Sequence, residues 1–311
     1  MPATFNRMVL AKAETTYATA NAPAGTDALQ VGNDLKLNPL QLGLVDRDLL
    51  YPFVGNRGQL VAQKLAQISF SFELVGSGTA GTAPKTGVLF RAAGYGETIV
   101  AATSVTYAPI GTGYEGITID CHHGGKRHRL TGTRGNITVE GSVGGVLMGK
   151  FDGLGFYVPV TDQSNPTPTY SAHSAPLIIN SDNTATVSIQ GYTACLESFS
   201  LNGGRSPQLH QRAGCSKQIR IDLARNPEGS LMIESPTIAA KDYFAACLAQ
   251  TEATISFTHG ATAGNIVAFT STSALGEPEY DDADGVEMLS LPFRPIPTIT
   301  NGYDDHSFIF T

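Results

Sequence analysis

The sequence contains no tryptophan, and charged residues make up only 15% of its 311 positions. Sugar-binding clefts use aromatic platforms, and sugar cleavage needs two placed carboxylates, so the composition argues against a protein that binds or cleaves carbohydrate. No apolar run approaches the roughly 20 residues of a membrane-spanning helix, so we expect no membrane partner. The cysteines lack CxxC spacing, which favours free thiols over a disulfide framework or a metal site; they are Cys121, Cys195, Cys215 and Cys247.

Basic residues are also scarce, and the formal net charge is -7 at pH 7. This balance argues against a broadly basic surface that would bind nucleic acid non-specifically. It is compatible with solubility, or with a cavity that repels polyanions. The first ten residues lack the continuous apolar region of a signal peptide, which predicts synthesis and folding in a cytoplasm.

Residues 65–94 predict a strand followed by a short helix. Apolar and polar side chains alternate from Ala66 to Leu74, which is the period of a strand with one buried face. Val88 and Leu89 each have an alanine four positions later, as on one face of a helix. Gly94 is a suitable residue for the end of that helix.

A second stretch repeats this order. Residues 230–234 predict a strand, and residues 238–249 predict a helix. The segment Leu-Phe-Arg-Ala-Ala at 89–93 falls on Tyr-Phe-Ala-Ala-Cys at 243–247, and hairpin patterns follow both. A repeat with so long a period suggests duplicated domains rather than a solenoid, whose units are shorter.

The predicted fold class is therefore mainly β, with two duplicated β-sandwich or β-barrel domains that each carry a short flanking α-helix. The abundance of glycine, with 34 residues, and the near absence of long amphipathic helical patterns agree with this class. The predicted parts are an N-terminal arm at 1–26, a first domain at 27–160, a linker at 161–190, a second domain at 191–296 and a C-terminal arm at 297–311.

Two polar stretches are candidate contact surfaces. Residues 41–63 predict a long loop interrupted by proline and glycine, and its aromatic and arginine side chains are typical of interfaces. Residues 202–215 occupy the corresponding place in the second domain. A merely solvated loop is the alternative for the first stretch. The candidate contact residues are Arg47, Tyr51, Phe53 and Arg57 in the first stretch, and Arg205, His210 and Arg212 in the second.

The two ends of the chain are predicted to be arms. The N-terminal arm is rich in alanine and threonine, and we expect partial order until something packs on it. The C-terminal arm carries Tyr303, Phe308 and Phe310 in a polar setting, which predicts an arm that contacts another subunit. A frayed terminus is the alternative.

Several motifs suggest chemistry that their context does not support. Residues 111–116 satisfy G-x-G-x-x-G, but the following residues predict a strand, whereas a dinucleotide site needs a helix there. Residues 144–150 resemble a phosphate-binding loop, but Phe151 stands where a hydroxyl is required. His122 and His123 are adjacent, so on a strand they point to opposite faces and cannot both bind one metal without a bulge. We expect no cofactor, no metal and no catalytic site.

Several segments in combination resemble the tail tube, or major tail, proteins of long-tailed bacteriophages. The similarity covers nearly the whole chain and lies in Ala11 to Tyr17, Val45 to Arg47, Glu73 to Pro84, Leu89 to Gly94 and Thr258 to Val267. The resemblance implies a structural virion protein of tail-tube-type domains. Such proteins assemble into stacked rings around a channel through which DNA leaves the virion without specific binding.

The resemblance also implies partners. Six tube domains commonly close a ring in this family, so a chain with two domains predicts a ring of three chains with pseudo-sixfold symmetry; a hexamer of the whole chain is the alternative. The contact loops would reach an adjacent ring, and further partners would be the tape measure, terminator and distal tail proteins. Another ring-forming part, such as a terminator or baseplate ring, is an alternative function, and a carbohydrate-binding β-domain protein, which the composition disfavours, is a further one.

Overall fold

The computed structural model of the protein describes residues 7–170, 172–184, 186–300 and 302–311. The predicted mainly β class with two short helices is confirmed, but the sheets do not close into a barrel. We call β1 to β10 the first half and β11 to β21 the second half. A 3-10 turn (Gly25–Asp27) precedes β2, α1 (Gly87–Ala92) follows β4, and α2 (Tyr243–Leu248) follows β16.

The strands are short apart from a few in the first half. The first half contains β1 (Arg7–Ala13), β2 (Ala28–Leu29), β3 (Lys36–Asp46), β4 (Gln59–Glu73), β5 (Tyr95–Val100), β6 (Ser104–Pro109), β7 (Ile117–His123), β8 (Lys126–Ser142), β9 (Met148–Tyr157) and β10 (Thr161–Asp162). The second half contains β11 (Thr186–Ile189), β12 (Tyr192–Thr193), β13 (Leu196–Asn202), β14 (Gln208–His210), β15 (Gln218–Arg220), β16 (Glu228–Glu234), β17 (Ala253–His259), β18 (Val267–Leu275), β19 (Glu279–Ala283), β20 (Val286–Pro295) and β21 (His306–Phe310).

Both predicted strand–helix units are present. In β4 the alternating apolar side chains, including Phe70 and Phe72, are buried in the core, as their period predicts. The helix α2 is shorter than predicted because the Asp242 carboxylate accepts a hydrogen bond from the Ala245 backbone N–H (2.8 Å) and caps its start.

The two halves pair their strands in the same order. In the first half, neighbours follow in the order β1, β7, β8, β9, β4 and β3. In the second half, the order is β11, β17, β18, β20, β16 and β13. The first half additionally contains the β5–β6 hairpin between its helix and β7. The duplication of domains itself stays a prediction.

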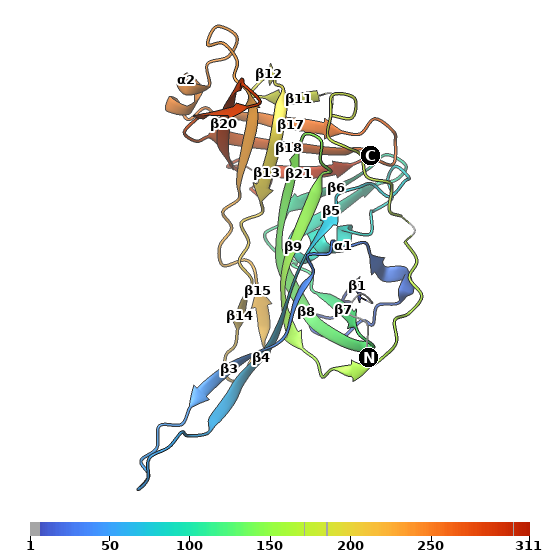
Figure 1. Ribbon diagram of the computed structural model, residues 1–311, viewed down its shortest axis with the longest axis vertical. Helices are drawn as coiled ribbons and strands as arrows, with labels where there is room; N and C mark the ends of the chain where they lie inside the picture. Colours follow the sequence, from blue (N-terminus) through green and yellow to red (C-terminus); the bar gives the residue numbers. More distant parts are fainter. Residues whose placement is uncertain (1–6, 171, 185, 301) are drawn as a thin grey trace.

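Two strand pairings join the halves. The end of β8 pairs antiparallel with β13, from Ser142 opposite Ser198 to Thr138 opposite Asn202. The last strand, β21, lies between β6 of the first half and β18 of the second. Figure 1 shows β21 near the β5–β6 hairpin, and β9, β8 and β13 side by side in the middle of the molecule. One continuous apolar core extends through both halves.

The prediction of a free C-terminal arm is wrong for its last residues. Phe308 is fully buried, with its ring centroid 5.5 Å from Phe90 of the first half and 5.3 Å from Phe269 of the second. Phe310 is also buried and packs edge-on against Tyr107. Their partner strands are distant in sequence, so the segment resembles a free arm only when it is considered alone.

The prediction of a loosely ordered N-terminal arm is corrected in the same way. β1 pairs with β7 over its full length, from Arg7 opposite His123 to Ala13 opposite Ile117. Val9 and Leu10 are buried. Residues 1–6 lie outside the described residues.

The predicted linker at 161–190 is partly strand. β10 pairs with β8, and β11 pairs with β17, so the last residues of this stretch belong to the second half. Between them the chain runs along the first half, where the Thr169 N–H donates to the Gly25 carbonyl (2.9 Å). Residues 171 and 185 of this stretch lie outside the described residues.

A buried polar cluster lies beside β21. His306 Nδ1 lies 2.8 Å from the Asp305 carboxylate, its Nε2 lies 2.8 Å from the Tyr95 hydroxyl, and Arg225 forms an ion pair with Asp305. Burial lowers the pKa of His306 below its ordinary value, although Asp305 opposes this. Burial alone would raise the pKa of Asp305, but the hydrogen bonds that it accepts from His306 and Arg225, together with the charge of Arg225, outweigh burial and lower it. A neutral His306 therefore donates to Asp305 and accepts from Tyr95.

The Phe308→Ala variant should lose about 3–5 kcal/mol of unfolding free energy, because it leaves a cavity between the cores of the two halves. Chemical denaturation followed by circular dichroism measures this. The matched control is Tyr303→Ala, since that ring is half exposed. Equal losses in the two variants would contradict the assignment of Phe308 as the link between the halves.

The stabilising effect of His306 should weaken in acid. Because its folded pKa is depressed, the unfolded chain takes up a proton near pH 6.5 that the folded chain does not, so stability falls as pH drops below about 6.5. His306→Gln should cost about 1–3 kcal/mol at pH 7.5, and that difference should shrink towards pH 5. The control is His123→Gln on the partly exposed end of β7. A difference for His306→Gln that is the same at both pH values would exclude this role.

Candidate subunit interfaces

The most conspicuous surface feature is an arm formed by β3 and β4. The two strands pair from Lys36 opposite Ser69 to Asp46 opposite Gln59. β4 gains its second neighbour, β9, only from Leu65 onward, and Figure 1 shows the rest of the ribbon projecting away from the body. Both ends of the predicted loop at 41–63 are therefore strand, and only its middle part, residues 47–58, is a connecting loop. Pro39 and Gly43 lie at irregularities of the ladder, where a strand tolerates them.

The arm exposes a large apolar surface. Leu50 and Val54 at its tip are fully exposed, and many other apolar side chains along both strands are exposed by 39% or more. Contiguous apolar surface of this kind marks interaction sites, and the unpaired edges of the arm can accept further strands. The exposed apolar residues are Leu40, Leu42, Leu44, Val45, Leu49, Leu50, Tyr51, Phe53, Val54, Leu60 and Val61.

The structure brings the four predicted contact residues of the first stretch together at the arm tip. The rings of Tyr51 and Phe53 stack with centroids 5.8 Å apart, and the Arg57 guanidinium lies 4.6 Å from the Tyr51 ring centroid. Arg57 also donates to the backbone carbonyls of Gly55 (2.7 Å) and Phe53 (3.1 Å). Together with Arg47 these residues line one shallow hollow. Arg57 therefore shapes the tip as well as lying on its surface.

Of the three predicted residues of the second stretch, two lie in the β14–β15 hairpin, and the third is buried in the body of the chain. His210 ends β14 and is half-buried, while Arg212 is exposed in the turn before β15. Arg205 is only 7% exposed and donates to the carbonyls of Gly94 (3.3 Å), Ile110 (3.1 Å) and Ile221 (3.2 Å). Its role as an outward contact is corrected, because its guanidinium is occupied within the chain.

The β14–β15 hairpin packs on the first half through residues that sequence reasoning missed. The Ile219 backbone N–H donates to the Tyr17 hydroxyl (2.7 Å), and Arg134 donates to the Ile219 carbonyl (2.9 Å). The Arg134 guanidinium stacks 4.3 Å from the Tyr17 ring centroid. Ile219 itself packs against Leu65 and Leu154. These contacts join segments far apart in sequence, so no local pattern signals them.

One face of the sheet that crosses both halves is mostly polar. The strands follow in the order β3, β4, β9, β8, β13, β16, β20 and β19. Alternate residues on these strands point into the core, and the others form a surface that we call the polar face. Its half-buried and exposed polar members are Lys36, Asn38, Gln67, Ser69, Ser71, Glu73, Asn136, Thr138, Glu140, Ser142, Lys150, Asp152, Ser198, Ser200, Asn202, Glu228, Ser230, Glu234, Glu279, Asp281, Ser290 and Arg294.

Acidic side chains outnumber basic ones on the polar face. Its basic members are Lys36, Lys150 and Arg294, and two of them lie near carboxylates, with Lys150 4.0 Å from Asp152 and Arg294 3.6 Å from Glu228. Its remaining charged members are all acidic. The face therefore combines small hydroxyl side chains with a net negative charge, which sequence reasoning could not assign to one surface.

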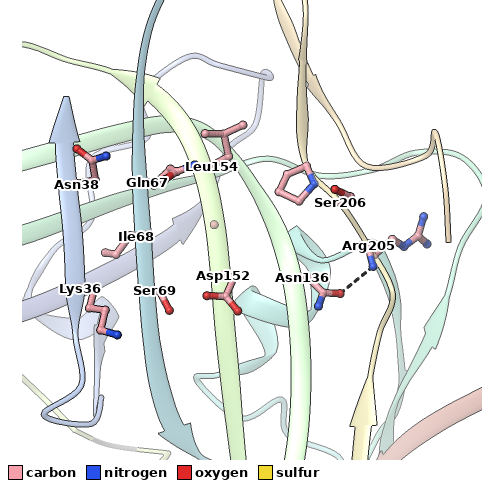
Figure 2. Close-up of a pocket in the computed structure, with 12 residues that line it drawn as sticks. Lys36, Asn38, Gln67, Ile68, Ser69, Asn136, Asp152, Leu154, Arg205 and Ser206 are labelled. Atoms are coloured by element: carbon pink, nitrogen blue, oxygen red, sulfur yellow. Dashed lines mark hydrogen bonds between the residues drawn. The ribbon is translucent and has the colours of Figure 1, made fainter. Parts of the chain in front are cut away.

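Figure 2 shows one hollow of the polar face. Lys36 and Asn38 of β3, Gln67 and Ser69 of β4, and Asp152 of β9 extend from neighbouring strands. At its edge the Arg205 backbone N–H donates to the Asn136 side-chain oxygen (2.9 Å), and the Asn136 amide donates to Asn202 (2.7 Å) across the β8–β13 junction. These hydrogen bonds hold the second half against the first half at the polar face.

The discounted motifs have the following places in the structure. Residues 111–116 lead directly into strand β7, and residues 144–150 form a turn that enters strand β9. Across residues 7–170, 172–184, 186–300 and 302–311, no group of three His, Cys, Asp or Glu side chains could hold a metal ion. In that same part of the chain, no helix is both long and apolar enough to cross a membrane.

An exposed apolar arm, unpaired strand edges and a continuous polar sheet face are typical of structural proteins that assemble with other copies. The family model for phage tail tube protein matches residues 4–295, and the chain belongs to this family. The family identifies a structural component of the phage tail, and hence of the virion. Comparison with curated proteins finds no match.

Proposed function

We propose that this chain assembles into rings that stack to form the tail tube, and that DNA passes through the channel of the tube into the host. The observation that supports this most is the polar face, because a single sheet surface without interruption crosses both halves of the chain. A wall of this kind continues from chain to chain when the free edges of the sheet pair with those of neighbours.

The ring has three chains with pseudo-sixfold symmetry. The same pairing order in the two halves supports this count, since each half then supplies one of six similar sectors. The interfaces alternate between a junction within the chain and a junction between chains. A ring of six whole chains is the alternative.

The polar face lines the channel. Its acidic side chains repel the phosphates of DNA, so the DNA slides through without specific binding. Hydroxyl side chains such as Ser69 and Ser200 give the wall a polar surface without large projections. The apolar sides of the same strands are buried in the core and cannot serve this purpose.

The arm makes contacts between rings. Its tip residues Arg47, Tyr51, Phe53 and Arg57 lie at the far end of the ribbon, where an adjacent ring can cover them. His210, Arg212 and Tyr303 remain candidates for smaller contacts, because Arg212 is exposed and the other two are partly exposed. Removal of the apolar tip from water is the driving force for stacking.

Other assignments belong to the same proposal. The protein is made and assembled in the host cytoplasm, and the tube contacts the tape measure, terminator and distal tail proteins. A terminator or baseplate ring is the second candidate function. Because a terminator forms one ring and a tube protein stacks without limit, the length of the assemblies distinguishes the two.

Placing charges on the arm tip should block stacking without unfolding the chain. Burial of Leu50 and Val54 at a contact is worth about 3–6 kcal/mol, so the variant Leu50→Asp with Val54→Asp should raise the concentration needed for tubes at least about tenfold. Sedimentation velocity and negative-stain electron microscopy measure this. The matched control is Ile299→Asp, a fully exposed apolar side chain outside the arm. Tubes of normal length from the arm variant would contradict the role of the arm.

A further inference from the structure

The junction between the two halves shows how one sheet edge receives the next. β8 pairs along its first part with β7, and along its last part, Thr138 to Ser142, with β13. Glu140 lies opposite Ser200 in this ladder, and both side chains point to the polar face. β13 thus pairs with the part of this edge of β8 that does not pair with β7.

The second half presents a similar edge that has no strand beside it in the described structure. There β18 pairs with β17 as β8 pairs with β7, and β19 pairs with β20 as the end of β8 pairs with β9. Asp281 lies opposite Met288, just as Glu140 lies opposite Met148. β19 is exposed along nearly its whole length.

The first half presents the strand that corresponds to β13. β3 pairs with β4 as β13 pairs with β16, and on its other side β3 has no strand partner among the residues described. The pairs Glu73–Met148 and Glu234–Met288 align β4 with β16. Ser230 then corresponds to Ser69, and their partners Ser200 and Lys36 correspond to each other.

We propose that β19 of one chain pairs antiparallel with the start of β3 of a second copy, with Asp281 opposite Lys36. The register is that of the β8–β13 junction, with Asp281 in the place of Glu140 and Lys36 in the place of Ser200. It makes the polar face continuous from one chain to the next. The joint rests on the proposed ring, and it specifies which edges close that ring.

The side chains brought together by this register are complementary. On the polar face, Lys36 meets Asp281, and Asn38 meets Glu279. On the other face, Leu37 meets Tyr280, whose ring is 61% exposed in the single chain. Opposite charges and apolar groups directly across a ladder stabilise it. The arm begins directly after this joint, just as the segment that carries β14 and β15 begins after β13.

Cysteine crosslinking tests the register in assembled tubes. In a background without the exposed or partly exposed Cys195, Cys215 and Cys247, the pair Lys36→Cys with Asp281→Cys should react with a short thiol crosslinker. A denaturing gel should then show linked chains up to a closed ring. The matched control is Lys36→Cys with Asp282→Cys, because residue 282 points to the opposite face. Tubes in which the control links as well as the test pair would overturn the register while leaving the tube intact.

Charge reversal gives an independent measurement if the cysteine variants assemble poorly. Lys36→Asp alone and Asp281→Lys alone should each raise the concentration needed for tubes at least about threefold, and the double variant should restore it to near the wild-type value. A double variant as poor as the worse single variant would exclude the pair. Wild-type protein that forms no ring or tube would instead refute the proposed function.

Discussion

The backbone ladder between β8 and β13 is the constraint on which the rest of the structure depends. It joins two halves with the same strand order into one sheet. Its register also decides which face of the second half continues each face of the first half. Successive side chains of a strand point to opposite faces of the sheet. This one register therefore places the core-facing residues of both halves on one face of the sheet and their polar residues on the other face. The continuous apolar core and the continuous polar face are both consequences of this register.

A second strand pairing also holds the two halves together. β21 lies between β6 and β18, and Phe308 packs against aromatic rings from both halves. These two strand pairings between the halves lie on different strands, which restrains rotation about either one. In contrast, the arm tip has few contacts with the body and gains burial only when another molecule covers it. The contacts that join the halves and the exposed apolar side chains of the arm therefore lie on different segments.

The sequence predicted what local patterns encode and missed what distant contacts decide. Alternation around Phe70 and Phe72 identified β4, and the helix that follows was placed correctly. The whole arm was predicted as a loop because Pro52, Gly55 and Gly58 suggest breaks, whereas these residues lie only in the connection at its tip. Phe308 and Phe310 were predicted to lie on a free arm because their partner strands are far away along the chain. Burial of Arg205 depends on carbonyl groups from three separate segments, which no spacing rule reveals.

The most direct test of the whole account is a cryo-electron microscopy reconstruction of tubes assembled from the purified chain. The account predicts three chains in each ring, with the polar face of the sheet towards the channel and the apolar core behind it. Six chains in each ring would contradict the pseudo-sixfold ring of three chains. A channel lined by another surface would contradict the role of the polar face. A chain that stays monomeric at high concentration would contradict the assembly itself.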